Sequence, residues 1–305
     1  MNIDLVYLWV DGNDPEWLEK KQKFLPKKIN TIGRYQDNDE LMYSLRSVEK
    51  HLPWINKIYI VTDNQIPSFI DPNHPKISIV DHTEIIPKEF LPTFNSVIIE
   101  YFIYKIPGLS EYFLYANDDT FINADVSPDT FFTKEGLPIV RLQRRFMGKW
   151  RNYISKRLKL YTNVYRKTIH KSALLVEKRF NKYYSGIPHH NVDSYLKSSF
   201  KNVIEQDFKN EISATLKNQV RKESDIQRII HSYYALATKK GKLHYVNRSE
   251  SCRIRLHKKS YMKFITRYNP VFFCLNDSHH ATDDDRKRVK PFLEILFSEK
   301  SSFEK

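Results

Sequence analysis

Residues 112–119, YFLYANDD, are five apolar or aromatic residues followed directly by Asn117, Asp118 and Asp119. A short run of this composition is typical of a buried strand. The first half of the chain contains further runs of the same kind, at residues 3–10, 57–62, 77–80 and 137–142. We therefore expect the chain to begin as a series of short buried strands.

Helical patterns separate these runs. In residues 39–51, with Leu52 just beyond, apolar side chains recur on one face, and Asn38 or Asp39 can cap the start. A second helical pattern covers residues 95–105, and from about residue 143 the chain is mainly helical and polar. Strands that alternate with helices predict a mostly parallel sheet. We predict an α/β fold, Rossmann-like, with a mainly helical second half, in one domain over residues 1–305.

The composition is that of a basic globular protein. Its 305 residues include 50 Lys and Arg against 36 Asp and Glu, a formal charge of +14, so we expect an anionic partner such as a polyanion or an anionic lipid surface. Residues 141–182 hold 14 Lys or Arg and one acid, Glu177. We expect residues 141–185 to form a basic helical insertion or lid, although a solvated helical face is the simpler explanation of such a run.

Acidic residues follow four of the predicted strands, where the carboxyl ends of a parallel sheet form a ligand-binding crevice. They are Asp11 and Asp14, Asp63, Asp81, and the Asn117-Asp118-Asp119 triplet. One such aspartate is more often a turn or helix cap than a ligand. Two adjacent carboxylates repel each other, and a divalent cation or a raised pKa usually holds them together. The triplet therefore indicates a metal-assisted site for a phosphate substrate.

Basic and histidine side chains are available to such a site. Arg46 lies on the first predicted helix, and Arg221 precedes a later helical pattern, although a solvated position is the commoner fate of one arginine. Residues 186–191, GIPHHN, place His189 and His190 after a proline, and imidazole can act as acid, base or phosphate ligand near neutral pH. A surface histidine pair is the simpler alternative.

Several enzyme classes lose support because their motifs are missing. The chain has no Walker loop, no GxGxxG and no GxSxG, and only seven glycines. Its two cysteines, Cys252 and Cys274, fit a reducing compartment. The first apolar run ends at Asp11, far short of a membrane span, and no basic leader precedes it. We expect a cytoplasmic protein.

Four segments in order resemble one known family. IDLVYLWVDGNDPEW (3–17) resembles its first segment, and RYQDNDELMYSLRSVEKHLPWINKIYIVTDN (34–64), continuing through LPTFNSVIIEYFIYKIPGLSEYFLYANDDTFI (91–122), resembles its longest one. The IPHH loop with VRKESDIQRIIHSYYAL (220–236) is similar to the third segment, more loosely. FFCLNDS (272–278) and LFSEKSSFE (296–304) are similar to the fourth. The family is that of the Stealth hexose-1-phosphate transferases, to which bacterial capsule polymerases belong.

This resemblance implies a GT-A-like catalytic domain that cleaves a nucleotide sugar at its pyrophosphate. A sugar-1-phosphate, of UDP-hexose or UDP-N-acetylhexosamine type, would pass to a glycan hydroxyl, with release of nucleoside monophosphate. Asp118, Asp119, His189 and Arg221 match positions where the family places active-site groups, whereas His190 does not carry over. We expect Asp11, Asp14, Arg46, Asn95 and Asn117 at the substrate, and Asp119 with Asn276 or Asp277 at a divalent cation, Mg²⁺ or Mn²⁺.

Two other functions remain open at this stage. A conventional metal-dependent glycosyltransferase would use the same acids but release nucleoside diphosphate, and a noncatalytic polyanion-binding module would use only the basic surface. For the transferase we expect a nucleotide sugar donor, a glycan acceptor and no nucleic acid. We also expect a cytoplasmic location with peripheral contact to the anionic inner face of the cell membrane.

Overall fold

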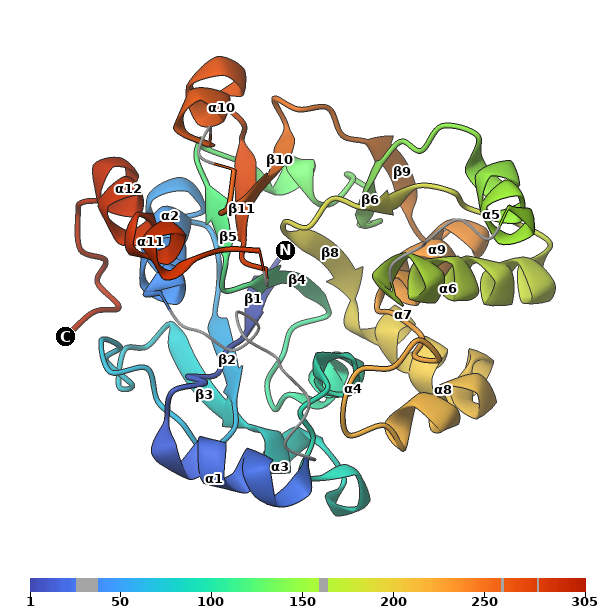
Figure 1. The fold of residues 1–305 in the computed structure, drawn as a ribbon, viewed down its shortest axis with the longest axis horizontal. Helices are drawn as coiled ribbons and strands as arrows, with labels where there is room; N and C mark the ends of the chain where they lie inside the picture. Colours follow the sequence, from blue (N-terminus) through green and yellow to red (C-terminus); the bar gives the residue numbers. More distant parts are fainter. Residues whose placement is uncertain (26–37, 159–163, 259–260, 279) are drawn as a thin grey trace.

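A computed structural model describes residues 1–25, 38–158, 164–258, 261–278 and 280–305 (Figure 1). Its strands are β1 (Ile3–Leu8), β2 (Ile58–Thr62), β3 (Ile77–Asp81), β4 (Tyr112–Asn117), β5 (Thr120–Ile122), β6 (Ile139–Gln143), β7 (Ile187–Pro188), β8 (Asp193–Leu196), β9 (Lys242–Tyr245), β10 (Ser251–Arg255) and β11 (Phe272–Asn276). Its α-helices are α1 (Pro15–Phe24), α2 (Glu40–His51), α3 (His82–Ile85), α4 (Ser96–Phe102), α5 (Gly148–Arg157), α6 (Val164–Phe180), α7 (Lys197–Asn202), α8 (Lys209–Leu216), α9 (Ile229–Ala237), α10 (Tyr261–Tyr268), α11 (Asp283–Lys287) and α12 (Val289–Leu296). Short 3₁₀ or π turns occupy Lys88–Phe90, Ile103–Lys105, Pro128–Thr130 and Val203–Asp207.

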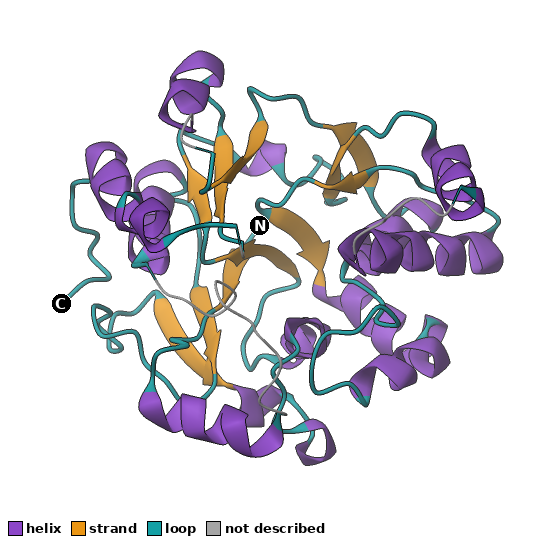
Figure 2. Cartoon of the chain, viewed as in Figure 1, coloured by secondary structure: helices purple, strands orange, loops and turns teal. Residues whose placement is uncertain are grey.

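The central sheet has the strand order β3-β2-β1-β4-β8. β3, β2, β1 and β4 run parallel, and β8 is antiparallel to β4. Leu8 is level with Val61 on one side and Asn117 on the other, so the carboxyl ends of these strands meet at one edge. The predicted α/β class, a mostly parallel sheet flanked by helices, is confirmed (Figure 2).

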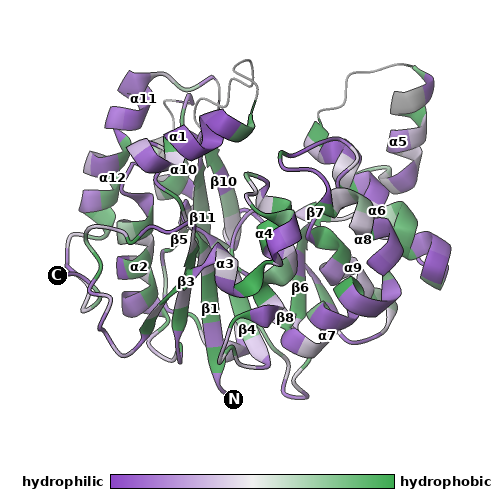
Figure 3. Cartoon of the chain, turned by 90° about the horizontal axis from the view of Figure 1, so that it is seen from below, coloured by the Kyte–Doolittle hydropathy of each residue, from purple (hydrophilic) through white to green (hydrophobic). Residues whose placement is uncertain are grey.

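Helices cover both faces of the sheet (Figure 3). Leu41, Leu45 and Val48 of α2 pack in one core with alternate residues of β1 and β2, as their helical spacing predicts. On the other face, α4, α6 and α9 share a second core with the remaining strand residues. The predicted cap on α2 is wrong for Asp39, which has a φ of 63° and makes no capping hydrogen bond.

The second half contains more strands than its polar composition predicts. β7, β6 and β9 form one small sheet, and β10, β11 and β5 form another. The run at residues 137–142 is thus a strand, β6, but outside the central sheet. β5 leaves β4 through the Asp118-Asp119 turn and pairs with β11, which carries Asn276 at its end. This pairing brings the chain's fourth family-like segment to the sheet edge.

The basic segment at residues 141–185 contains most of β6, α5 and α6; residues 159–163 lie outside the described residues. Ile169, Ala173 and Val176 of α6 are buried in the core that includes α9. α6 is therefore built into the domain, and within this segment the exposed apolar side chains concentrate on residues 146–158. No helix in the described part of the chain has the length and apolar character to cross a membrane.

Candidate active site

The Asp118-Asp119 turn lies at the carboxyl edge of the central sheet and is held by β11. Asp119 N donates to Asp118 Oδ1 at 3.0 Å, and Leu275 N donates to Asp119 O at 2.9 Å. The Cys274 thiol donates to Asp119 Oδ2, with Sγ and Oδ2 3.2 Å apart. Asn276 and Asp277 follow Leu275 in the chain, so Asp118, Asp119, Asn276 and Asp277 come together with a cysteine that was not predicted.

Asp119 is a carboxyl whose ionised form is disfavoured by its surroundings. Burial raises its pKa well above the usual range, and the charges of Glu40 and Asp277 raise it further. Glu40 is itself only 5% exposed. Asp119 Oδ1 is buried and has no hydrogen-bond partner among the described residues. A buried carboxylate oxygen without a partner, beside other acids, suits a cation ligand.

The predicted metal ligands differ in whether their oxygens are still available to bind a cation. Asp277 accepts from Arg286 at both oxygens, 2.8 Å to Nε and 3.3 Å to Nη2, and Arg286 is 7% exposed. Across the described ranges, no three His, Cys, Asp or Glu side chains form a ready metal cage. Mg²⁺ commonly binds through one or two carboxylates and keeps water or substrate phosphate in its other positions. Asp119 and Asn276 fit that open kind of site.

A second polar cluster adjoins this turn through Tyr115. The Tyr115 hydroxyl lies 3.0 Å from Asn117 Oδ1 and 3.3 Å from Glu100 Oε1, and the Arg228 guanidinium stacks on the Tyr115 ring at 3.9 Å. Arg228 Nη1 donates to Asp193 Oδ2 at 2.8 Å, and Arg228 Nε lies 3.5 Å from Glu100 Oε2. One arginine, whose side chain is 15% exposed, thus joins α4, β4 and β8.

The charge of Arg228 controls its acidic partners. Burial works to raise the pKa of Asp193, but Arg228 and His189 outweigh it and lower the pKa to about 2. Glu100 shows the opposite balance, since burial raises its pKa in spite of Arg228. The cluster therefore holds Asp193 ionised at neutral pH.

His189 is buried in this cluster. Its Nδ1 lies 2.9 Å from Ser251 Oγ and its Nε2 lies 3.2 Å from Asp193 Oδ1. Burial lowers the pKa of His189, against the attraction of Asp193. His190 has left-handed backbone geometry with φ 59°, and its Nε2 lies 3.0 Å from Arg253 Nη1. The structure brings His189 beside the edge, but as a fully buried group with both nitrogens facing protein.

Arg221 reaches the same edge from the loop before α9. Asp225, which is fully buried, organises this loop by accepting from Lys222 N at 2.8 Å and from Asn95 Nδ2 at 2.9 Å. Arg221 donates to Ser96 Oγ at the start of α4, and its charge opposes the burial that raises the pKa of Glu100. Arg221 remains partly exposed. It is therefore a cation that a substrate can contact.

Asn95 does not fit its predicted substrate-binding role. Its side chain caps α4 by accepting from Val97 N, and its Nδ2 donates to Asn218 O and Asp225 Oδ2. The residue is fully buried. These contacts make Asn95 the tie between α4 and the Arg221 loop, and we correct its assignment accordingly.

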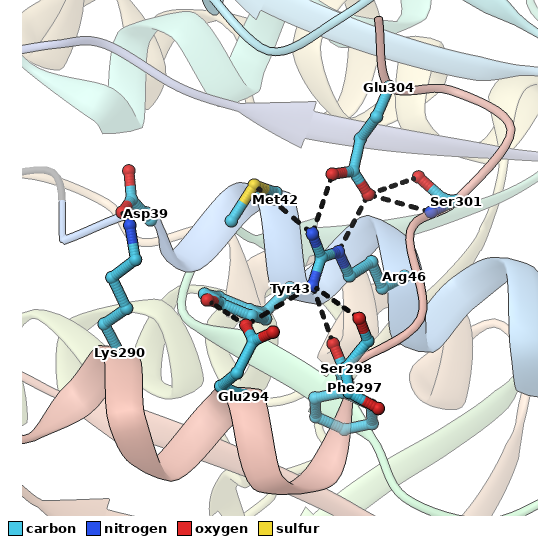
Figure 4. A network of polar contacts seen from close by, with 10 residues as sticks. All are labelled: Asp39, Met42, Tyr43, Arg46, Lys290, Glu294, Phe297, Ser298, Ser301 and Glu304. Atoms are coloured by element: carbon cyan, nitrogen blue, oxygen red, sulfur yellow. Dashed lines mark hydrogen bonds and ion pairs between the residues drawn. The ribbon is translucent and has the colours of Figure 1, made fainter.

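Arg46 is also placed away from the substrate (Figure 4). Its Nε and Nη2 each donate to a different oxygen of Glu304 at 2.8 Å, and its Nη1 donates to Phe297 O at 2.9 Å. Nη1 also lies 3.5 Å from Glu294 Oε2. Because the guanidinium is 7% exposed and hydrogen-bonded to the C-terminal segment, the predicted substrate contact of Arg46 is corrected to a structural role.

The other strand-end aspartates mostly serve local structure. Asp14 caps α1 by accepting from Trp17 N at 2.8 Å, and Asp11 Oδ1 accepts from Asn13 N at 2.8 Å. Asp81 caps α3 in a capping box, as its turn preference predicts. Asp63 pairs with Lys20 of α1, which packs over this part of the edge. Asp11 and Asp14 border the site, but hydrogen bonds to their own loop occupy them.

Sequence reasoning missed the Glu100, Arg228 and Asp193 cluster. Asp193 lies four residues after His189, a spacing that could have suggested their contact. Arg228 lies in a quoted family-like segment, seven residues after Arg221. Nothing in the helical pattern around Glu100 marks it as buried and charged. Their meeting depends on β8 pairing with β4.

Comparison with known proteins matches two family models. One is "Stealth protein CR1, conserved region 1", over residues 1–29, and the other is "Stealth protein CR2, conserved region 2", over residues 34–140. The capsular polysaccharide phosphotransferase WcwK of Streptococcus pneumoniae is 33% identical over 329 aligned positions, covering 100% of this chain and 99% of that protein.

Other relatives match about half of the chain. The capsular polysaccharide phosphotransferase cps1A of Actinobacillus pleuropneumoniae is 42% identical over 159 residues, which are 50% of this chain and 44% of that protein. The exopolysaccharide phosphotransferase cps2G of Lactiplantibacillus plantarum is 46% identical over 138 residues, 45% of this chain and 41% of its own. Among solved structures, the galactosyltransferase LgtC in complex with donor and acceptor sugar analogues aligns at 12% identity with a TM-score of 0.46, covering 96% of each chain.

Proposed function

The chain belongs to the Stealth protein family, and from this membership we propose that it is a phosphotransferase of capsular or other cell-surface polysaccharide synthesis. It transfers a sugar-1-phosphate from a nucleotide sugar to a glycan hydroxyl. The hydroxyl oxygen attacks the phosphorus that bears the sugar, a phosphodiester forms, and the pyrophosphate P–O bond breaks to release nucleoside monophosphate. The full-length match to a named phosphotransferase carries this proposal.

Asp119, with Asn276, would hold the divalent cation. When bound, the cation would neutralise charge on the pyrophosphate and the departing nucleoside monophosphate. Asp119 Oδ1 supports this role because it is buried, unpaired within the described residues and surrounded by negative charge. The metal is Mg²⁺ or Mn²⁺, both of which accept such oxygen ligands.

Arg221 binds the donor's phosphates, since it is partly exposed at the edge near Glu100 and, unlike Arg228, forms no ion pair with a described acid. Asp118 is half-buried in the same turn as Asp119. Its carboxylate acts as the general base that takes the proton from the acceptor hydroxyl. His189 is assigned a positioning role: it orients Asp193, which in turn holds Arg228 against the ring of Tyr115. The Tyr115 hydroxyl lies 3.0 Å from Asn117 Oδ1. Asn117 thereby presents a fixed amide to the substrate.

Product analysis tests this reaction. The protein is incubated with UDP-glucose or UDP-N-acetylglucosamine, Mg²⁺ and short glycan acceptors, and the nucleotide products are separated. We expect nucleoside monophosphate and a phosphorus-linked glycan in equal amounts, because the pyrophosphate bond is the one cleaved. Nucleoside diphosphate with a glycosidic product would instead identify a conventional glycosyltransferase.

Contact with an anionic membrane is a further part of the proposal. Phe146, Trp150 and Tyr153, at the start of α5 and along it, are 82%, 70% and 57% exposed. Lys149 and Arg157 are exposed on the same helix. Aromatic residues among basic ones are characteristic of segments that lie in the membrane interface. α5 lies toward the same end of the molecule as α1, the end at which β1 to β4 terminate (Figure 3).

We expect Phe146→Ser with Trp150→Ser to weaken binding to phosphatidylglycerol vesicles at least about tenfold, since each aromatic ring contributes about 1.5–3 kcal/mol when buried. Co-sedimentation measures the binding, and added salt should weaken it in the parent protein. Ile295→Ser, on α12, is a matched control because Ile295 is 71% exposed but lies outside this surface. Equal binding by all three proteins would remove α5 from the interface.

A further inference from the structure

A buried arginine lies away from the Asp118-Asp119 turn, and no hydrogen bond from its guanidinium is found to any described residue. Arg141, in the middle of β6, is 4% exposed. Its guanidinium stacks on Phe272 at 4.4 Å and approaches Phe131 at 6.0 Å. Nη1 is buried without a hydrogen-bond partner in the described part of the chain. Burial lowers the pKa of Arg141 to about 10, so the cation is held at a free-energy cost.

Arg141 lines an open hollow of about 800 Å³ at the other end of the sheet. The hollow lies where α2 ends at His51 and the loop after β5 passes beneath it, since Val126 N donates to His51 O. That end of α2 leads into the start of β2, so the hollow is at the amino edge of the sheet. It is therefore a different place from the Asp118-Asp119 turn.

The acids that line the hollow are already paired with other groups. Glu250 accepts from Asn247 N at 2.9 Å, and its other oxygen lies 2.5 Å from His244 Nε2. Asp125 Oδ1 lies 2.8 Å from His51 Nδ1. Lys50, which is exposed at the rim, has no such partner among the described residues. Among the described residues, neither Arg141 nor Lys50 forms an ion pair within 4 Å, and the charges of Glu250 and Asp193 act on Arg141 only at longer range.

The rest of the lining suits a sugar. Pro53, Trp54 and Pro128, which are exposed or partly exposed, give the hollow flat apolar surfaces beside the guanidinium. Trp54 is held in place because its Nε1 donates to Val126 O at 2.6 Å. A pyranose ring stacks on such surfaces, and an arginine binds the oxygens of a phosphate with paired hydrogen bonds.

We propose that this hollow binds a phosphate group of a phosphorylated glycan, with Arg141 as the anchor and Lys50 at the rim. The phosphate part rests on Arg141 and the geometry of the hollow alone. The glycan part rests on the proposed function, because a phosphodiester-linked product would bring a phosphate and a sugar together. The site would hold a part of the glycan remote from the reacting hydroxyl.

Calorimetric titration of the full chain with glucose-1-phosphate, inorganic phosphate and glucose tests the site. We expect Arg141→Met to weaken binding of glucose-1-phosphate at least tenfold, and Lys50→Glu to weaken it severalfold without touching the core. Arg144→Met is the matched control, because Arg144 is exposed on the same segment and stacks on Tyr245 instead. Unchanged binding by Arg141→Met and Lys50→Glu would overturn the proposal. Equal affinity for inorganic phosphate and glucose-1-phosphate would overturn its glycan part.

Thermal unfolding without ligand separates a binding role from a structural one. Since an unpaired buried cation destabilises the fold, Arg141→Met should unfold at the same temperature as the parent or higher. A lower unfolding temperature would show that Arg141 stabilises the fold by stacking on Phe272, and this result would overturn the proposed binding site. Asp119→Asn should keep glucose-1-phosphate binding at the hollow while losing turnover, so failure of the proposed reaction and failure of this site give different results.

Discussion

Asp119→Asn is expected to reduce turnover by roughly 10³-fold while leaving the protein folded. The Asp119 carboxylate offers the buried, unpaired oxygen of the acidic turn, and an amide in its place removes the negative charge that would hold a divalent cation. Asparagine has nearly the same shape, and its carbonyl can still accept from the Cys274 thiol. The loss should therefore fall on the chemistry.

Three measurements make this expectation precise. Turnover with Mg²⁺ and a nucleotide sugar should fall, Mg²⁺-dependent stabilisation against heat should disappear, and the unfolding temperature without metal should stay level or rise. Asp129→Asn is the matched control, since Asp129 is exposed on the Pro128–Thr130 turn and serves no part of the site. Full turnover by Asp119→Asn would remove the residue from catalysis, and turnover lost together with the fold would assign it a structural role.

Arg46→Ala is expected to lower the free energy of unfolding by about 3 kcal/mol. Removing this guanidinium leaves Glu304, whose side chain is 4% exposed, as a buried acid without its cation (Figure 4). Burial acts to raise the pKa of Glu304, but the hydrogen bonds and charge of Arg46, together with the hydrogen bonds from Ser301, outweigh it and lower that pKa. The carbonyl of Phe297 loses its donor at the same time. The C-terminal segment should detach from α2 as a result.

Denaturant unfolding measures this loss, and proteolysis should cut the C-terminal segment sooner in the variant. Glu294→Gln is the control, because Glu294 is half-exposed and 3.5 Å from the same guanidinium, and it should cost less than about 1 kcal/mol. Donor affinity of Arg46→Ala, measured below its unfolding transition, should match the parent. A large loss of donor affinity with unchanged stability would show that Arg46 binds the substrate, as the sequence predicts.

The strands of the first half and their acidic ends could be predicted because both depend on local sequence. An apolar run of five or six residues specifies a buried strand, and parallel connection brings successive carboxyl ends to one edge. The Asp118-Asp119 turn was therefore predicted at the place where it lies. The strands of the second half were missed because short runs such as β8 and β11 become strands only by pairing with β4 and β5.

The roles of Arg46 and Asn95 could not be predicted in the same way. Arg46 lies a few residues after Asp39 and Glu40 in sequence, yet its partner Glu304 is 258 positions away. Asn95 precedes a helix at the sheet edge, yet Asp225, 130 positions away, takes its amide. In both cases a side chain that the sequence places near the site forms its hydrogen bonds with a segment distant in sequence, and it is therefore not available to a substrate.

The order of motifs along the chain was enough to identify the family, the α/β class and the acidic edge, because each depends on short segments and their sequence. Which cations and histidines face a substrate was decided only when β8, β11 and the C-terminal segment packed against the central sheet. A charged side chain pairs with whichever opposite charge the fold brings within a few ångströms, and burial makes that choice costly to reverse. For this reason Arg228 and Asp193, which pair with each other, lie at the site, whereas Arg46, which pairs with Glu304, does not.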